Sequence, residues 1–265
     1  MPTDGRTLTL ARAEIGDRLR PYRHTALLVA IITLLAVRPL VSSTGAGPAL
    51  YSIAIMLVLM VALYTIQVDE LVGDRELLLK QRKHRAVVGW VLAIIAIALR
   101  LAIIVSPSHQ LATIGGISWL SFFAYVTLTE LRGVLKQKRI TRESISMSVS
   151  VYLLLGLTWG LFYILLFDLQ PQAFNFGGAP APSGQQVTPV LIYFSLTTLA
   201  TVGYGDITPA TLQARYAAVS EGIAGQFYLA ILVARLVGMQ MNQSSIQQTE
   251  DQNREQDADQ PEAKD

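Results

Sequence analysis

Residues 201–206 read Thr201-Val202-Gly203-Tyr204-Gly205-Asp206. They follow an apolar run, 190–200, that is too short to cross a bilayer, and they precede a longer one, 215–239. Pro189, just before the short run, is typical of the first turn of a helix. Backbone that leaves a helix at membrane depth is tolerated only where it is buried in protein or lines water. Glycines at alternate positions allow successive carbonyl groups to point the same way. The pattern therefore predicts a re-entrant helix followed by a loop.

The composition excludes several classes of protein. Of 265 residues, 52% are hydrophobic and 15% are charged, whereas soluble domains carry about 25% charged residues. The absence of cysteine excludes disulfide scaffolds and thiolate metal sites. The three histidines lie far apart, which argues against a histidine zinc site. The loops contain no Ser/His/Asp set and no paired carboxylates, so we expect no enzyme.

Six apolar stretches are long enough to cross about 30 Å of hydrocarbon, namely residues 25–41, 49–68, 86–106, 111–129, 149–167 and 215–239. Groups of five basic residues precede the first stretch and separate the second from the third and the fourth from the fifth. The connections between the first and second stretches, between the third and fourth, and between the fifth and the short run carry no basic residue. The positive-inside bias then places both termini in the cytoplasm. The first stretch could alternatively be a cleaved signal peptide, but Arg38 near its end argues against that.

The expected fold class is an all-α integral membrane protein with six transmembrane helices plus a re-entrant helix and loop. Its parts are a cytoplasmic N-terminal segment (1–24), a four-helix domain (25–129), a cytoplasmic linker (130–147), a domain containing the re-entrant loop (148–239) and an acidic tail (240–265). The tail is rich in Gln, Asp and Glu and is predicted to be disordered.

The string Thr198-Leu199-Ala200-Thr201-Val202-Gly203-Tyr204-Gly205-Asp206 resembles the pore signature of potassium channels. The resemblance covers residues 189–239 and implies a selectivity filter formed by residues 201–205, whose carbonyl oxygens replace the hydration shell of K⁺. The implied ion ligands are the carbonyls of Thr201, Val202, Gly203 and Tyr204, with the Thr201 hydroxyl as the innermost ligand. Four such loops surround one axis in this family, so a single copy implies a homotetramer. No cofactor is implied besides the permeant ion.

The resemblance also implies supporting residues around the filter. Tyr204 would point away from the axis and pack near Tyr193 and Phe194, and Asp206 would lie at the outer mouth. The residues expected to support the filter are Thr198, Asp206, Tyr193, Phe194 and Glu221. Some family members carry a glutamate where this chain has Thr197, so no carboxyl pair can form there.

The last apolar stretch contains a candidate hinge. Gly225 lies nineteen residues after Asp206, at the position of the hinge glycine of potassium channels. Glycine weakens a helix by up to about 1 kcal/mol relative to alanine. The alternative is that Gly222, Ala224 and Gly225 allow close helix packing. The sequence leaves both interpretations open.

Glu221 is the one acidic residue inside a predicted span. An ionisable group at that depth is costly and marks a functional candidate. We expect it to form a structural hydrogen bond that braces the half-helix, with a role in gating as the alternative. Arg100 is a candidate partner.

Residues 111–129 contain no charged side chain, which argues against strong voltage sensing. The predicted function is a potassium-selective channel subunit that is weakly voltage-gated or not gated by voltage. The resemblance to small bacterial channels implies a bacterial inner membrane, with lipids as partners and no nucleic acid. The basic segment 130–143 either couples the first helices to the pore or meets anionic lipid head groups. The alternatives are a non-conducting regulatory subunit and, less favoured because no repeat is seen, a secondary transporter.

Overall fold

The computed structural model describes residues 22–41, 54–55, 57–58, 60–65, 76–106, 108–137 and 140–258. Its helices are α2 (Arg23–Val41), α4 (Glu76–Val105), α5 (His109–Lys136), α6 (Arg142–Leu169), α7 (Val187–Leu199) and α8 (Leu212–Ala258). The described residues between 54 and 65 are also helical. Between α6 and α8 lie two 3₁₀ turns, η2 (Pro171–Ala173) and η3 (Gly184–Gln186), and two short strands, β1 (Phe174–Asn175) and β2 (Thr208–Pro209).

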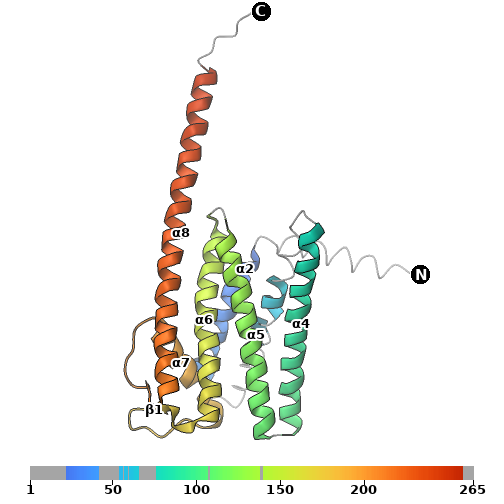
Figure 1. Ribbon diagram of the computed structural model, residues 1–265, viewed down its shortest axis with the longest axis vertical. Helices are drawn as coiled ribbons and strands as arrows, with labels where there is room; N and C mark the ends of the chain where they lie inside the picture. Colours follow the sequence, from blue (N-terminus) through green and yellow to red (C-terminus); the bar gives the residue numbers. More distant parts are fainter. Residues whose placement is uncertain are drawn as a thin grey trace, which may run out of the picture.

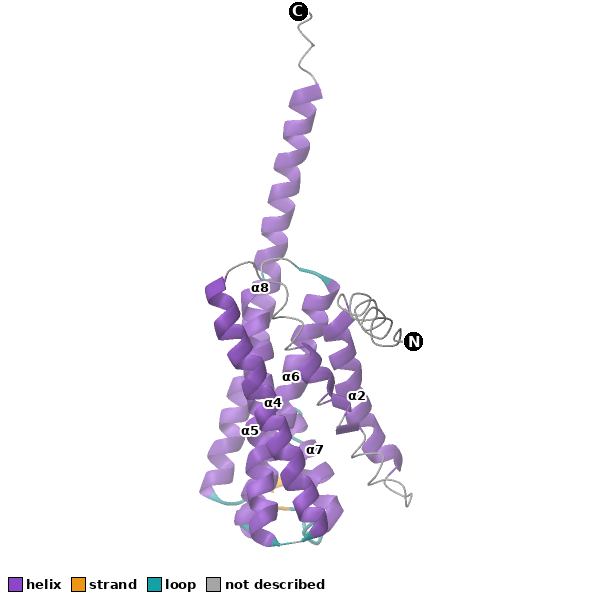
Figure 2. Cartoon of the chain, turned by 90° about the vertical axis from the view of Figure 1, so that its right-hand side faces the viewer, coloured by secondary structure: helices purple, strands orange, loops and turns teal. Residues whose placement is uncertain are grey.

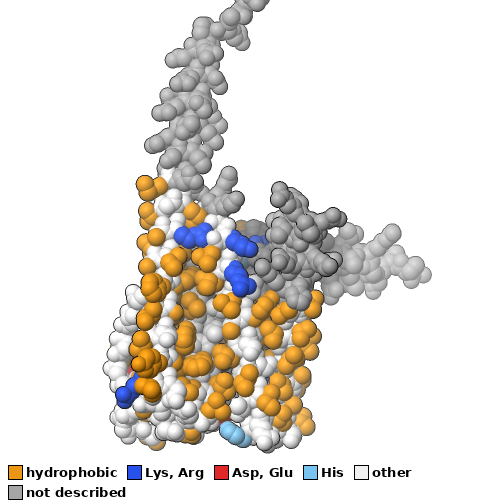
Figure 3. All heavy atoms as spheres, in the orientation of Figure 1, with side chains coloured by type: hydrophobic (Ala, Val, Ile, Leu, Met, Phe, Trp, Pro, Cys, Tyr) orange, Lys and Arg blue, Asp and Glu red, His pale blue; other side chains and the backbone are white. Residues whose placement is uncertain are grey.

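The chain is a helical membrane protein. Helices α5 and α6 and the Leu212–Met241 part of α8 are long and apolar enough to cross a bilayer, and Arg23–Val37, Val87–Ile103 and α7 are shorter apolar helices. Apolar side chains are spread over the visible face of the bundle, and Lys and Arg lie mostly near the end from which α8 projects, with one basic patch near the opposite end (Figure 3). Much of the predicted second span, 49–68, falls outside the described residues, so the count of six spans stays a prediction.

Helix α6 is the centre of the arrangement, since it packs against α2, α5, α7 and α8. Small residues on α6 let α7 approach closely, as is common in membrane helix packing. A Cβ at Gly156 would lie 2.6 Å from Leu196 Cδ2, and one at Gly160 would lie 3.1 Å from Ile192 Cα. Figures 1 and 2 place α7 and the strands at the end of the bundle opposite to the projecting part of α8. Helix α7 is therefore held against the side of α6 at that end.

The connections on either side of α7 are joined by a small antiparallel sheet. Phe174 pairs with Pro209 and Asn175 with Thr208, and the Ala210 amide donates to the Ala173 carbonyl at 2.8 Å. Gly177 has a φ of +62°, and a Cβ there would lie 3.0 Å from the carbonyl oxygen of Asp206. These contacts fix the far end of the 201–206 loop.

The segment expected to be a cytoplasmic linker, 130–147, is largely helical in its described residues, and its cytoplasmic location stays a prediction. Helix α5 continues to Lys136, and Gln137 caps it by donating its amide to the Val134 carbonyl. Helix α6 begins at Arg142, where Thr141 and Ser144 form a capping box. Leu, Arg and Lys have high helix propensity, so an apolar helix continues readily into a basic segment. Only residues 137–141 separate the two helices in the sequence, and the two helix ends that flank them are called the α5–α6 corner below.

The acidic tail also differs from its prediction, because α8 stays helical as far as Ala258. Starting a helix is costly, whereas extending one adds a hydrogen bond for each residue fixed. Gln and Glu have propensities near that of Leu, so the polar tail continues the apolar helix that precedes it. Figure 1 shows this part of α8 projecting well beyond the bundle.

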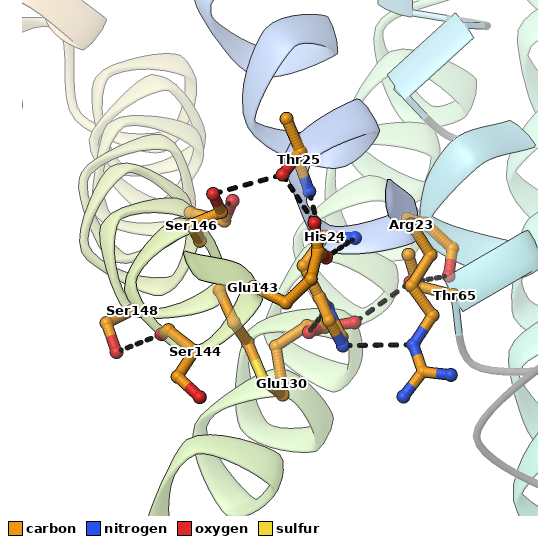
Figure 4. Close-up of polar contacts among 12 residues, drawn as sticks. Arg23, His24, Thr25, Thr65, Glu130, Glu143, Ser144, Ser146 and Ser148 are labelled. Atoms are coloured by element: carbon orange, nitrogen blue, oxygen red, sulfur yellow. Dashed lines mark hydrogen bonds and ion pairs between the residues drawn. The ribbon is translucent and has the colours of Figure 1, made fainter. Parts of the chain in front are cut away.

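A polar cluster fixes α2 against α5 and α6 (Figure 4). The Glu143 carboxylate accepts from the His24 amide at 3.0 Å and from the Thr25 hydroxyl at 2.6 Å, and thereby caps the start of α2. Glu130 is 2% exposed and accepts from the Thr65 hydroxyl at 2.9 Å. His24 Nδ1 lies 3.4 Å from Glu130 Oε2. Two carboxylates from the predicted linker thus hold the first described helix in place.

Replacing Glu143 with alanine should loosen α2, because the donors at its start lose their acceptor. We expect E143A to lower the free energy of unfolding by about 1–2 kcal/mol, the usual cost of losing a helix cap. Unfolding in detergent followed by circular dichroism measures this. E143Q keeps one acceptor oxygen and should lose less. Wild-type stability in both variants would show that Glu143 does not hold α2.

Candidate functional site

The loop after α7 is set by hydrogen bonds that return to the helix. The amides of Val202 and Gly203 both donate to the Thr197 carbonyl, at 2.8 and 3.3 Å. The described residues contain no cis peptide bond, and in a trans peptide the C=O points opposite to the N–H. The carbonyls of Thr201 and Val202 therefore both point away from α7.

The backbone angles of the loop alternate in sign. Thr201, Gly203 and Gly205 have φ of +56°, +53° and +81°, whereas Val202 and Tyr204 do not have positive φ. An ordinary strand has negative φ throughout and alternates its carbonyls between two sides. Alternation in the sign of φ instead turns successive carbonyls toward one side. Glycine adopts positive φ without strain, but for the β-branched Thr201 this conformation is costly and is typical of functional sites.

The expected supporting residues Tyr193, Thr198 and Asp206 lie around this loop. The ring of Tyr204 stacks on that of Tyr193, with centroids 6.4 Å apart and planes 3° apart. The Tyr193 hydroxyl donates to Asp206 at 2.9 Å. The Thr198 hydroxyl donates to the Phe194 carbonyl at 2.8 Å, and the Thr198 carbonyl accepts from the Thr201 amide at 3.0 Å. The loop is thus tied to α7 by side chains at its far end and by backbone at its start.

Phe194 lies in a different place from the one expected, because it faces the interior rather than Tyr204. Its ring centroid lies 5.1 Å from that of Tyr163 and 5.2 Å from that of Phe174, both in edge-on arrangements. Phe194 therefore anchors α7 to α6 and to the outer connection, while Tyr193 alone supports the Tyr204 ring.

Glu221 joins three helices behind the loop. It is fully buried on α8, and it accepts from the Tyr163 hydroxyl of α6 at 2.7 Å. Its other oxygen lies 2.5 Å from the Ser195 hydroxyl of α7. Arg100 is exposed on α4, and the described residues contain no ion pair between it and Glu221. The predicted brace is present, and its partners are hydroxyl groups.

The contacts of Ser195 bear on the protonation of Glu221. The Ser195 oxygen lies within hydrogen-bond distance of both Glu221 Oε1, at 2.5 Å, and the Gly156 carbonyl, at 2.7 Å. A serine hydroxyl has one hydrogen, and a carbonyl can only accept. If Glu221 is neutral and donates to Ser195, the serine can donate to Gly156 and both contacts are satisfied. The geometry therefore favours a neutral carboxylic acid at this position.

Gly225 packs against the end of α7. A Cβ at this position would lie 2.8 Å from the Leu199 carbonyl oxygen, which also accepts from the Tyr152 hydroxyl at 3.1 Å. A Cβ at Gly222 would meet nothing within 4 Å. Close packing therefore explains Gly225, and its role as a hinge stays a prediction.

Several residues of the site were missed in the sequence. Thr197 acts through its backbone carbonyl, which no side-chain pattern can indicate. Ser195 and Tyr163, which hold Glu221, and Tyr152, which binds the end of α7, are polar residues inside apolar runs. That position was the available signal, because polar side chains inside membrane helices usually find a partner on another helix.

The loop is open on one side of the single chain. Val202 is 50% exposed and Tyr204 is 71% exposed. Within the part of the chain that the structure describes, no three His, Cys, Asp or Glu side chains come together as metal ligands.

Comparison with known proteins agrees with this geometry. Residues 151–241, which span most of α6, all of α7 and the membrane part of α8, match the family model described as "Ion channel". No curated protein and no solved structure matches the chain. The match supports a channel function for the part of the chain that contains the loop.

Replacing the Glu221 carboxyl group with an amide tests whether this group is neutral. In E221Q the side chain can accept from Tyr163 and donate to Ser195, so the thermal stability of the purified protein should stay near that of the wild type. In E221L the Tyr163 hydroxyl loses its partner, which costs about 1–3 kcal/mol for that buried group, while Ser195 keeps the Gly156 carbonyl. Equal destabilisation of both variants in a thermal unfolding assay would show that an ionised carboxylate is required.

The packing of Gly225 is tested against its neighbour on the same helix. G225A places a methyl group against the Leu199 carbonyl, and overpacking of this kind costs about 1–3 kcal/mol. G222A adds a methyl group in open space and should not destabilise the protein. Unfolding of both variants in the same detergent gives the comparison. A G225A protein as stable as G222A would contradict the packing role.

Proposed function

We propose that the chain is the pore-forming subunit of a potassium-selective channel, through which K⁺ passes down its electrochemical gradient along residues 201–205. The observation that carries the proposal is the loop backbone. Alternating φ at residues 201–205 and the two amides that donate to Thr197 both turn carbonyl oxygens to the side away from α7. No catalytic residue or cofactor takes part.

In this proposal the carbonyls of Thr201, Val202, Gly203 and Tyr204 replace the hydration shell of K⁺, and the Thr201 hydroxyl supplies the innermost ligand. Helix α7 ends where the loop begins. The carbonyl end of a helix carries about half a negative charge, which favours a cation near the inner end of the loop.

A homotetramer would complete the site, because one chain supplies one wall of it. Helix α8 carries an exposed apolar stripe, formed by Leu212, Tyr216, Val219, Ile223 and Phe227. Such a continuous stripe is suited to contact with lipid or with other copies. Around a fourfold axis the four loops would face one another, and the mass of the purified complex tests this stoichiometry.

The charge pattern supports a channel with weak voltage dependence or none. Residues 111–129 of α5 carry no charged side chain that could move in the membrane field. The basic groups in the sequence favour cytoplasmic termini. A bacterial inner membrane is the proposed location.

Selectivity is tested by the reversal potential of the purified protein in planar bilayers, with K⁺ on one side and Na⁺ on the other. We expect a reversal close to the K⁺ potential. G203A should abolish this selectivity, because alanine resists the positive φ at the cost of about 1–2 kcal/mol in each subunit. G184A is the matched control: Gly184 has a φ of +54° and, like Gly203, nothing within 4 Å of its Cβ position. It carries the same backbone strain outside the loop and should keep selectivity.

Two results would count against the proposal. A current that does not distinguish K⁺ from Na⁺ would mean that the loop is not a selectivity filter. The absence of current from a correctly assembled protein would favour the non-conducting subunit.

A further inference from the structure

Three polar side chains on one face of α8 join it to the rest of the chain. Glu221, Tyr228 and Arg235 are spaced seven residues apart, which is close to two helical turns. Glu221 bonds to Tyr163 and Ser195. The Tyr228 hydroxyl donates to the Ser148 carbonyl at 2.6 Å. The three contacts lie at successive levels along the helix, and Arg235 is farthest from the candidate filter.

Arg235 binds the end of α5. Its Nη1 donates to the Leu135 carbonyl and its Nη2 to the Gln137 carbonyl, the latter at 2.7 Å. Helix α5 ends at Lys136, and carbonyls at a helix C-terminus lack partners within the helix. A cation there interacts favourably with the helix dipole. The planar guanidinium can donate to two oxygens at once, which a lysine ammonium cannot do with the same geometry.

This contact matters because the inner half of α8, residues 227–241 of its membrane part, has little other support from its own chain. Only 11% of the apolar stretch of α8 that is long enough to cross a membrane is buried within the chain. The end of α5, by contrast, is well anchored, since the buried Glu130 bonds to Thr65 and faces His24 on α2. Arg235 therefore connects the lightly held inner half of α8 to the helices outside the pore region.

We propose that Arg235 is a positioning residue that couples α5 to the inner half of α8, and that it thereby sets the equilibrium between closed and open states. The proposal rests on the proposed channel function. Movement of the inner half of α8 relative to α5 breaks both hydrogen bonds of Arg235, so a change in the position of α5 acts on the pore-lining helix at this point. Two roles were expected for the basic segment 130–143: coupling of the first helices to the pore, and contact with anionic lipid head groups. The proposal favours coupling, through the α5–α6 corner.

The electrical test compares R235Q, R235K and R215Q in single-channel recordings. R235Q should change the closed–open equilibrium constant at least tenfold. The constant of R235K should fall between those of R235Q and the wild type, because lysine keeps the charge but cannot form both hydrogen bonds with the same geometry. Arg215 lies on the same helix near its other end and donates to the Pro209 carbonyl at 3.3 Å, so R215Q should keep the wild-type constant. The K⁺/Na⁺ reversal potential should stay unchanged in R235Q and R235K.

A second readout does not depend on conduction. Amide hydrogen exchange in lipid nanodiscs should become faster in R235Q at residues 230–241 of α8 and at the end of α5, since exchange reports local opening. R215Q should leave these segments as in the wild type. If R235Q does not assemble, R235K carries the same comparison with a smaller expected change.

The outcomes separate this inference from the proposed function. Unchanged exchange and an unchanged equilibrium constant in R235Q would overturn the coupling role. A loss of ion selectivity in R235Q would also overturn it, because the residue would then act on the filter. Faster exchange in R235Q together with no current from any variant, the wild type included, would support the contact while refuting the channel function.

Discussion

The arrangement of the site depends on one buried carboxyl group. Glu221 lies on α8 with no exposed surface and is bonded to hydroxyl groups of α6 and α7. A polar group in an apolar interior must find its partners inside the protein. The positions of Tyr163 and Ser195 meet that need only when the three helices meet at this level. The carboxyl group therefore fixes the depth of α7, a helix too short to set its own position by spanning the membrane.

The rest of the geometry follows from the placement of α7. Gly156 and Gly160 let it lie against α6, and Gly225 lets α8 pass its carbonyl end. The end of the helix in turn fixes the Thr197 carbonyl, which receives two amides of the loop. The direction of the first loop carbonyls is thus set by helix packing, while the positive φ at Gly203 and Gly205 lets the same direction continue.

The sequence predicted the parts of this arrangement that depend on rare residues at fixed spacing. Alternate glycines after a short apolar run predicted the loop, and a lone carboxyl in a span predicted a brace. Partners chosen by tertiary packing were harder to predict, so Arg100 was proposed for Glu221 where Tyr163 and Ser195 are found. Polar composition predicted disorder after residue 240, where α8 instead stays helical as far as Ala258. It failed there because a polar segment that continues an existing helix does not pay for nucleation.

The charged residues that lie at the α5–α6 corner or bond to it have a structural use that composition alone does not show. Helix ends present unpaired amides and carbonyls, and where several helices end together these groups need charged or polar partners. Glu143 satisfies the amides at the start of α2, and Arg235 satisfies carbonyls at the end of α5. Glu130 is buried and accepts from the Thr65 hydroxyl. Because Glu143 and Arg235 are bonded to helix ends, the α5–α6 corner joins α2 and α5 to α6 and α8 through directional contacts.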